Sequence, residues 1–148
     1  VMKEYYKNPE ATEKTLFDGW LLTGDMARVD EDGFIWLVDR KKDVIISGGE
    51  NIFPVEVEDA IMESSKIQDA AVIGVPDERL GEIAIAIVQL KPGQEMTEDE
   101  FFAYCEVIPR YKRPRKVFFE NVPRNPTGKI EKPKLREKFA GMAESFKI

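Results

Sequence analysis

The chain has 148 residues, of which 43% are hydrophobic and 34% charged, with a net charge of −6, one cysteine and no histidine. This composition is typical of a soluble globular protein, and no stretch approaches the roughly 18 apolar residues of a membrane span. One cysteine excludes an internal disulfide, and the absence of histidine removes the commonest general base and metal ligand. We expect a cytoplasmic protein, with peripheral contact with a membrane left open, whose chemistry depends on Lys, Arg, Asp or Glu.

The first 39 residues predict a short helix followed by antiparallel strands. Asn8-Pro9-Glu10 starts the helix, Trp20 to Thr23 predicts a strand, and Glu31-Asp32-Gly33 closes a hairpin between Met26 to Asp30 and Phe34 to Val38. So few residues do not bury a stable core, and Val1 lies within an apolar connection. We therefore expect residues 1–39 to end a larger domain, in a chain that is a fragment of a longer protein.

The stretch from Val38 to Glu58, VDRKKDVIISGGENIFPVEVE, predicts strand, charged pivot, strand, loop and helix. The charged cluster Asp39 to Asp43 precedes a β-branched run, Val44 to Ile46, and Pro54 begins the helix. Gly48 and Gly49 lie between this run and Pro54. They lack the spacing of the glycines in a Walker phosphate loop, so they must have a different role. The pivot is the expected boundary with a second domain, residues 40–148.

The second domain predicts an α+β fold: a small layer with helices packed on a sheet of about three strands. The expected strands are Asp69 to Val75, Glu82 to Leu90 with clear alternation, and Val117 to Phe119. Thr97 and Glu100 form the capping box of one helix. A further helix runs from Pro133 to Phe139, and residues 142–148 are expected to be frayed.

Two polar positions are candidates for chemistry, and each has a structural alternative. Lys129 follows Pro126-Thr127-Gly128 at the tip of a loop, where it could reach an anionic group outside its own domain or be a solvated turn lysine. Asp25 ends a strand after Thr23-Gly24, where its carboxylate could accept two hydroxyl groups or cap the turn.

Positive charge is concentrated in the last third of the chain. The first 105 residues hold 10 basic and 23 acidic side chains, whereas residues 106–148 hold 12 basic and 5 acidic ones. The segment Arg110 to Lys116 could stack an aromatic base on Tyr111 and neutralise a phosphate, or form a solvated basic edge. Nucleic acid is not the expected ligand, because no zinc finger or RNA-binding aromatic motif is present. Cys105, beside aromatic residues, is expected to be a buried core thiol.

Three motifs together resemble the adenylate-forming (AMP-binding) superfamily of acyl-CoA and aryl-CoA ligases, luciferases and peptide adenylation domains. They are LLTGD at 21–25, VDRKKDVIISGGENIFPVEVE at 38–58 and PTGKIEK at 126–132. The resemblance covers the whole chain, and YKNPEAT, GWLLTGD and YKRP are most similar to the C-terminal part of a fatty-acyl-CoA ligase. It implies the end of a large nucleotide-binding domain followed by a mobile lid domain.

The resemblance also implies a two-step reaction and roles for single residues. A carboxylate and ATP give acyl-AMP and pyrophosphate, and the acyl group then passes to the thiol of CoA. Asp25 matches an aspartate that accepts the ribose hydroxyls, and Arg40 matches an arginine near the ribose. Lys129 matches the lysine that bridges the substrate carboxylate and the α-phosphate. Lys42 falls at the position of the hinge of the lid. The alternative is that this segment is an ordinary charged turn between domains.

Two groups of residues would meet CoA by the same resemblance. One lines the pantetheine tunnel and the other holds the adenine and 3′-phosphate in some members of the family. The first group comprises Gly48, Gly49 and Glu50, and the second Tyr111, Arg113 and Arg115.

We therefore expect the C-terminal domain of an ATP-dependent long-chain fatty acid–CoA ligase, catalytically incompetent by itself. Its partners would be its own N-terminal domain, ATP, fatty acid and CoA, and Mg²⁺ is expected with ATP although the sequence shows no ligand for it. Two alternatives stay open: a ligase that loads a carrier protein, and a partner-binding module without catalysis.

Overall fold

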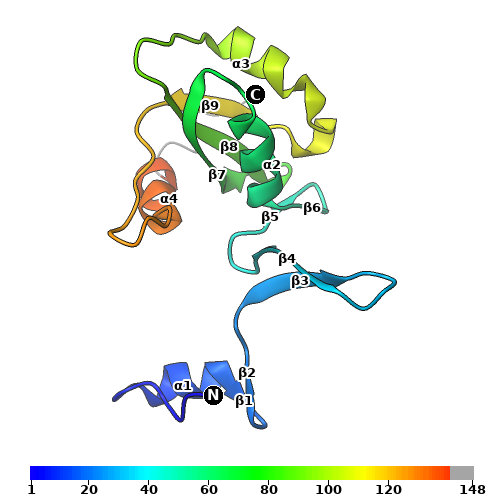
Figure 1. The fold of residues 1–148 in the computed structure, drawn as a ribbon, viewed down its shortest axis with the longest axis vertical. Coiled ribbons are helices and arrows are strands. Elements are labelled where there is room, and N and C mark those ends of the chain that lie inside the picture. Colours follow the sequence, from blue (N-terminus) through cyan, green and yellow to red (C-terminus); the bar gives the residue numbers. More distant parts are fainter. Residues whose placement is uncertain (141–148) are drawn as a thin grey trace. The chain divides into compact units, whose positions relative to one another are not determined.

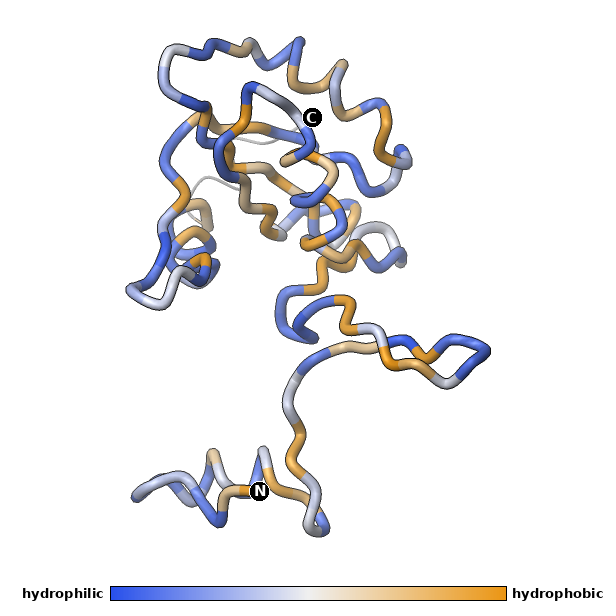
Figure 2. Tube along the Cα trace, viewed as in Figure 1, coloured by the Kyte–Doolittle hydropathy of each residue, from blue (hydrophilic) through white to orange (hydrophobic). Residues whose placement is uncertain are grey.

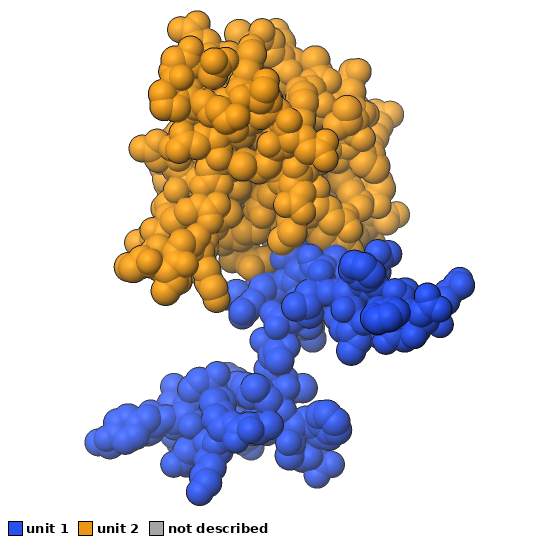
Figure 3. Space-filling model, in the orientation of Figure 1, with its two compact units in different colours: residues 1–42 blue, residues 43–148 orange. Residues whose placement is uncertain are grey.

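The computed structural model describes residues 1–140, so the frayed end expected at residues 142–148 lies outside the described part. The chain divides into two compact units, which Figure 3 shows in different colours. The first unit comprises Val1–Lys42 and the second begins at Asp43. This division lies close to the predicted boundary between residues 39 and 40. That the first unit ends a nucleotide-binding domain and the second is a mobile lid stays a prediction.

The first unit is a short helix followed by two hairpins. Helix α1 (Pro9–Thr15) begins after Asn8, whose Oδ1 accepts a hydrogen bond from Ala11 N at 3.0 Å. Strands β1 (Leu16–Phe17) and β2 (Trp20–Leu21) pair antiparallel, and so do β3 (Asp25–Val29) and β4 (Ile35–Arg40). Of residues 1–42 only Asp39 is buried, so this unit has no hydrophobic core of its own.

The second unit is built on a five-stranded sheet (Figure 1). Strands β7 (Ile67–Asp77) and β8 (Gly81–Leu90) form a long antiparallel hairpin, and β9 (Lys116–Phe119) runs parallel to β8. A short hairpin of β5 (Ile45–Ser47) and β6 (Glu50–Ile52) joins β8 where Ser47 lies opposite Gly81. The strand order is β6-β5-β8-β7, so β7 forms one edge of the sheet.

Helices cover both faces of this sheet. They are α2 (Pro54–Met62), α3 (Glu98–Tyr104), the 3₁₀ turns η1 (Cys105–Val107) and η2 (Arg110–Lys112), and α4 (Lys132–Ala140). The predicted capping box begins α3: Thr97 Oγ1 accepts a hydrogen bond from Glu100 N at 3.2 Å, and Thr97 N donates to Glu100 Oε2 at 2.9 Å.

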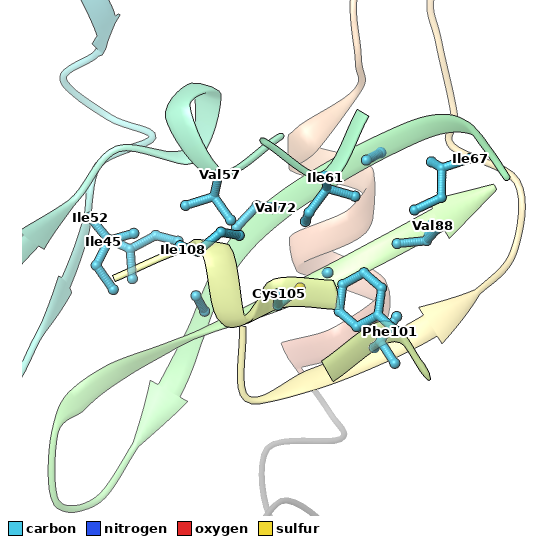
Figure 4. Close-up of a cluster of buried hydrophobic side chains, with 14 residues drawn as sticks. Ile45, Ile52, Val57, Ile61, Ile67, Val72, Val88, Phe101, Cys105 and Ile108 are labelled. Carbon is cyan, nitrogen blue, oxygen red and sulfur yellow. The ribbon is translucent and has the colours of Figure 1, made fainter. Parts of the chain in front are cut away.

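The hydrophobic core has two halves, one on each face of the sheet. Val72 packs with Val57 and Phe101 from α2 and α3, and Figure 4 shows this cluster. The next residue along β7, Ile73, packs with Phe139 of α4 on the opposite face. Because successive side chains of a strand point to opposite faces and both faces are covered, the middle of each long strand, residues 70–75 of β7 and 83–88 of β8, is apolar (Figure 2). Each fully buried Ile or Val contributes about 1.5–3 kcal/mol of transfer free energy.

The α+β class with helices packed on a sheet is confirmed. The sheet has five strands where about three were expected, because β5 and β6 join it as a hairpin. The run Val44 to Ile46 predicts a strand but not its pairing with β6, since strands of three residues carry too little periodicity to be recognised.

Candidate functional site

Lys129 lies in a tight turn that the structure fixes through its backbone. Arg124 and Ile130 form an antiparallel bridge, and inside it Asn125 N donates to Lys129 O at 2.9 Å. Gly128 N donates to Asn125 O at 2.8 Å, and Gly128 takes a φ of +83°, which favours glycine. Lys129 is exposed, and among residues 1–140 its ammonium group has no ion-pair partner.

The first unit brings Asp25 and Arg40 together. Asp25 begins β3 and Arg40 ends β4, and they lie opposite each other in the hairpin with Arg40 Nε 3.0 Å from Asp25 Oδ1. Thr23 Oγ1 accepts a hydrogen bond from Asp25 N at 3.2 Å, and Gly24 O accepts one from Lys41 N at 2.8 Å. The arginine thus orients a carboxylate whose side chain is 30% exposed and able to accept further hydrogen bonds.

The sequence predicts part of the arrangement that pairs Asp25 with Arg40. The turn predicted at Glu31-Asp32-Gly33 closes the hairpin and sets Asp25 near the far end of the opposite strand. A register shift between Met26 and Ala27 then decides which residue faces Asp25, and no local pattern reveals it. Sequence reasoning also missed Asp39, a buried carboxylate that accepts a hydrogen bond from Arg40 N at 2.7 Å.

The residues at the division between the units differ sharply in exposure. Lys41 and Lys42 are exposed, as a hinge role for Lys42 requires. Asp43 follows directly, and its side chain is only 12% exposed because Arg136 of α4 forms an ion pair with it. The described contacts therefore anchor the second unit up to Asp43 and leave Lys42 free of them.

Gly48 and Gly49 form the two-residue loop of the β5–β6 hairpin. Their φ values are +59° and +87°, the left-handed conformation that a type I′ turn needs at both positions, and Ser47 and Glu50 pair across it. The hairpin is tied to the start of β8, because Gly48 N donates to Leu80 O at 2.8 Å and Ile46 N donates to Glu82 Oε2 at 2.9 Å. The glycines therefore have a structural use as well as their expected place beside pantetheine.

The structure brings part of each predicted CoA-binding group onto contacting elements, since β6, which begins at Glu50, contacts η2, which contains Tyr111. Tyr111 of η2 is 47% exposed. Its neighbour Lys112 is paired with Glu56 of α2, and this hydrogen bond raises the pKa of the Lys112 ammonium group. Arg115 is exposed, while its backbone N donates to Ala84 O at 2.7 Å. The hairpin loop and Tyr111 thus lie on adjoining elements, and Arg115 begins the return to the sheet.

Arg113 differs from its neighbours, because its guanidinium group is engaged within the unit. Nε donates to Ile108 O at 2.7 Å and Nη2 donates to Glu106 O at 2.8 Å. These bonds hold the chain between η1 and η2. Cys105 of η1 is fully buried, as predicted, and burial raises the pKa of its thiol to about 11 although Arg113 offsets part of the shift. Cys105 is therefore protonated and inert at neutral pH.

No group of three or more His, Cys, Asp or Glu side chains within residues 1–140 lies close enough to hold a metal ion. None of the helices in this part of the chain is long and apolar enough to cross a membrane.

Comparison with known proteins identifies the family. Residues 56–129 match the model of the AMP-binding enzyme C-terminal domain. The chain is 47% identical over 142 residues to long-chain-fatty-acid–CoA ligase FadD13 of Mycobacterium tuberculosis, covering 95% of this chain and 28% of that protein. It is 41% identical over 139 residues to 2-succinylbenzoate–CoA ligase of Bacillus cytotoxicus, covering 93% of this chain and 28% of that protein.

Solved structures agree with this assignment. ATP-bound MatB from Rhodopseudomonas palustris matches with a TM-score of 0.88 at 34% identity, over 97% of this chain and 29% of that one. A Mycobacterium tuberculosis fatty acyl CoA synthetase matches with a TM-score of 0.69 at 46% identity, over 95% and 28%. The chain thus spans less than a third of the length of these relatives. It belongs to the AMP-binding enzyme C-terminal domain family of adenylate-forming enzymes, as its three motifs led us to expect.

Proposed function

We propose that this chain is the C-terminal part of an ATP-dependent ligase that joins a carboxylic acid to CoA through an acyl-adenylate. Family membership and the names of the relatives support this reading, and the identity to a long-chain-fatty-acid–CoA ligase favours a fatty acid as the substrate. The observation that carries the proposal is Lys129, an exposed ammonium group without an ion-pair partner in residues 1–140, presented by a fixed turn.

Adenylation needs such a cation. The reaction brings a carboxylate against a triphosphate, and two unit charges about 4 Å apart repel by roughly 1 kcal/mol in water and about 4 kcal/mol at an effective dielectric constant near 20. Lys129 placed between the carboxylate and the α-phosphate would offset this repulsion as the new bond forms. A lysine already neutralised by a neighbouring carboxylate would not serve, which is why its free ammonium group matters.

The nucleotide would be held by the first unit. The Asp25 carboxylate can accept both ribose hydroxyls, and Arg40 fixes its orientation from the opposite strand at 3.0 Å. Residues 1–39 would then be the end of the large nucleotide-binding domain, as the resemblance implies, and residues 40–148 the lid.

The second step has the opposite requirement. Transfer of the acyl group to a thiol needs Lys129 withdrawn and a path open for pantetheine. We place the hinge for this change at Lys42, because it is exposed at the division between the two compact units. Rotation about a few backbone dihedrals at such a position can move a whole lid.

CoA would meet the edge of the lid formed by the β5–β6 hairpin and η2. Gly48, Gly49 and Glu50 would line the pantetheine path, with Tyr111 stacking on the adenine. Arg115 is exposed and would contact the 3′-phosphate. We assign Arg113 the task of holding this turn in shape, because two of its nitrogens already donate to backbone carbonyls.

The test is an assay of the full-length enzyme that contains this chain. With ATP, CoA and a long-chain fatty acid we expect acyl-CoA, AMP and pyrophosphate, and slower turnover of 2-succinylbenzoate. The 148-residue chain alone should form no product. Acyl-adenylate that is passed to a carrier protein but not to CoA would identify the carrier-loading alternative. If no tested carboxylic acid supports pyrophosphate exchange, the result would favour the second alternative, a module that binds a partner without catalysis.

A further inference from the structure

Arg124 makes three separate contacts with its guanidinium group. Nε lies 2.6 Å from Asp69 Oδ2 and Nη2 lies 2.7 Å from Asp69 Oδ1, so the two side chains form a bidentate pair. The remaining nitrogen, Nη1, donates to Gly128 O at 2.5 Å. Asp69 belongs to β7, and its side chain is only 15% exposed. One arginine therefore connects the turn that carries Lys129 to the central sheet.

Asn125 holds the same turn from inside. Its Oδ1 accepts hydrogen bonds from Lys129 N at 2.9 Å, from Thr127 Oγ1 at 2.7 Å and from Thr127 N at 3.1 Å. The carbonyl of Gly128 and the N–H of Lys129 belong to one planar peptide group. Arg124 holds the oxygen of that group and Asn125 holds its nitrogen. The plane from which the Lys129 side chain projects is thus fixed at both ends.

We propose that Arg124, with Asp69 behind it, is a positioning residue for Lys129. The inference rests on the proposed function, in which Lys129 acts in adenylation. A glycine directly before the functional lysine makes the backbone permissive, and without these bonds the ammonium group would sample many positions. Fixing the peptide plane removes the backbone part of that freedom before the substrate arrives, and a misplacement of about 1 Å can lower a rate by roughly a hundredfold.

The geometry demands an arginine. A planar fork with donors on both edges can hold both oxygens of Asp69 and the Gly128 carbonyl together, whereas a lysine is a point charge on a flexible stem. Arg124→Lys keeps the positive charge beside Asp69 and so separates positioning from simple charge balance. A merely structural ion pair would be satisfied by either residue.

The test compares the two half-reactions in the full-length enzyme. We expect Arg124→Lys and Asp69→Asn each to slow acyl-adenylate formation by about 10- to 100-fold. Transfer from supplied acyl-adenylate to CoA should stay within about twofold, because the Lys129 turn is not used in that step. Combining the two substitutions should add little, since both remove the same support. Lys138→Gln, which removes the Lys138–Glu120 ion pair elsewhere on the second unit, is the matched control and should change neither step.

A readout apart from activity accompanies the assay. Hydrogen exchange of the Lys129 amide should become faster in Arg124→Lys, while amides of the central strands stay as protected as before. Lys129→Ala serves as the reference for the proposed function. If it abolishes adenylation while Arg124→Lys and Asp69→Asn leave it intact, the positioning role is wrong and the proposed function stands. If Lys129→Ala itself leaves adenylation intact, both are wrong. Equal losses in both half-reactions, with faster exchange throughout the unit, would reduce Arg124 to a general stabilising residue and overturn the inference.

Discussion

Lys132 and Glu58 form an ion pair of 2.8 Å in which the side chains are only 9% and 11% exposed. The same oxygen of Glu58 accepts a hydrogen bond from Val72 N at 2.7 Å. Val72 lies on β7, the edge strand, where an N–H without a partner strand needs another acceptor. Glu58 therefore satisfies one N–H of the sheet edge, and its pair with Lys132 joins α2, on one face, to the first residue of α4, on the other.

Replacing Lys132 by Met should lower the free energy of unfolding by about 3–5 kcal/mol, because it removes the cation of a buried ion pair. The measurement is urea unfolding of the 148-residue chain at pH 7, followed by far-ultraviolet circular dichroism. Adding Glu58→Gln should recover part of the loss, since the amide oxygen can still accept from Val72 N.

The matched control for this prediction is Lys134→Met. Lys134 pairs with Glu131 at 2.7 Å but is 67% exposed, so its loss should cost less than about 1 kcal/mol. Similar losses of unfolding free energy in Lys132→Met and Lys134→Met would contradict this prediction, because burial would then not increase the contribution of the Lys132–Glu58 pair to stability.

The thiol of Cys105 predicts a pH dependence of stability. Burial raises its pKa from 9.0 to about 11 in the folded state, so between these values the unfolded chain loses a proton that the folded chain keeps. Stability from this group is complete below pH 9 and declines as the pH rises towards 11. The difference in unfolding free energy between the wild type and Cys105→Ala should shrink by up to about 2 kcal/mol over this range.

A thiol reagent provides the check on the same group. At pH 8 the folded chain should not react, because the thiol is buried and protonated, and the urea-unfolded chain should react within minutes. Rapid labelling of the folded chain would contradict the packing of η1 against the sheet.

Substitutions of Gly49 in the β5–β6 hairpin loop should lower the stability of the chain by different amounts. Gly49 takes a φ of +87° with open space around the position of a Cβ atom, so Gly49→Ala should cost about 1–2 kcal/mol through backbone strain alone. Gly49→Asn should cost less, because asparagine tolerates the left-handed region. Unfolding of the two variants measures the difference, and an alanine variant as stable as the wild type would contradict the turn geometry.

How much of this fold the sequence predicts depends on how local each feature is. The capping box of Thr97 and Glu100 was predictable because its partners are three residues apart. The alternation of side chains in β8 correctly indicates a strand. It does not, however, separate a buried face from a solvent-exposed face, as the alternation of a surface strand does. Isoleucines such as Ile85 face α4 and alanines such as Ala84 face α2 and α3, so the alternation is one of size between two buried faces.

The candidate site follows the same rule. Lys129 stands out within its own motif, and Asp25 faces Arg40 through a hairpin that the sequence predicts. The support for Lys129 comes from Asp69, which is 55 residues away from Arg124 in the chain. No local sequence pattern predicts that Asp69 and Arg124 pair at that separation. Only the packing of the turn on β7 brings them together.

The nucleotide role of the first unit can be tested with Asp25→Asn in the full-length enzyme. An amide keeps the shape but loses the charge that makes the carboxylate a strong acceptor for ribose hydroxyls, and it breaks the ion pair with Arg40. We expect the KM for ATP to rise by about tenfold or more, corresponding to roughly 1.4 kcal/mol. Asp32→Asn, on the exposed turn of the same hairpin, is the control and should leave the KM unchanged.

The most direct test of the account separates the half-reactions of Lys129→Ala in the full-length enzyme. Acyl-adenylate formation, followed by carboxylate-dependent release of pyrophosphate, should fall by about a thousandfold or more, whereas transfer from supplied acyl-adenylate to CoA should stay near the wild-type rate. Lys134→Ala, an exposed lysine five positions further along the chain, should retain both activities. Loss of both half-reactions to the same extent in Lys129→Ala, or full adenylation without this side chain, would contradict the role that we give it.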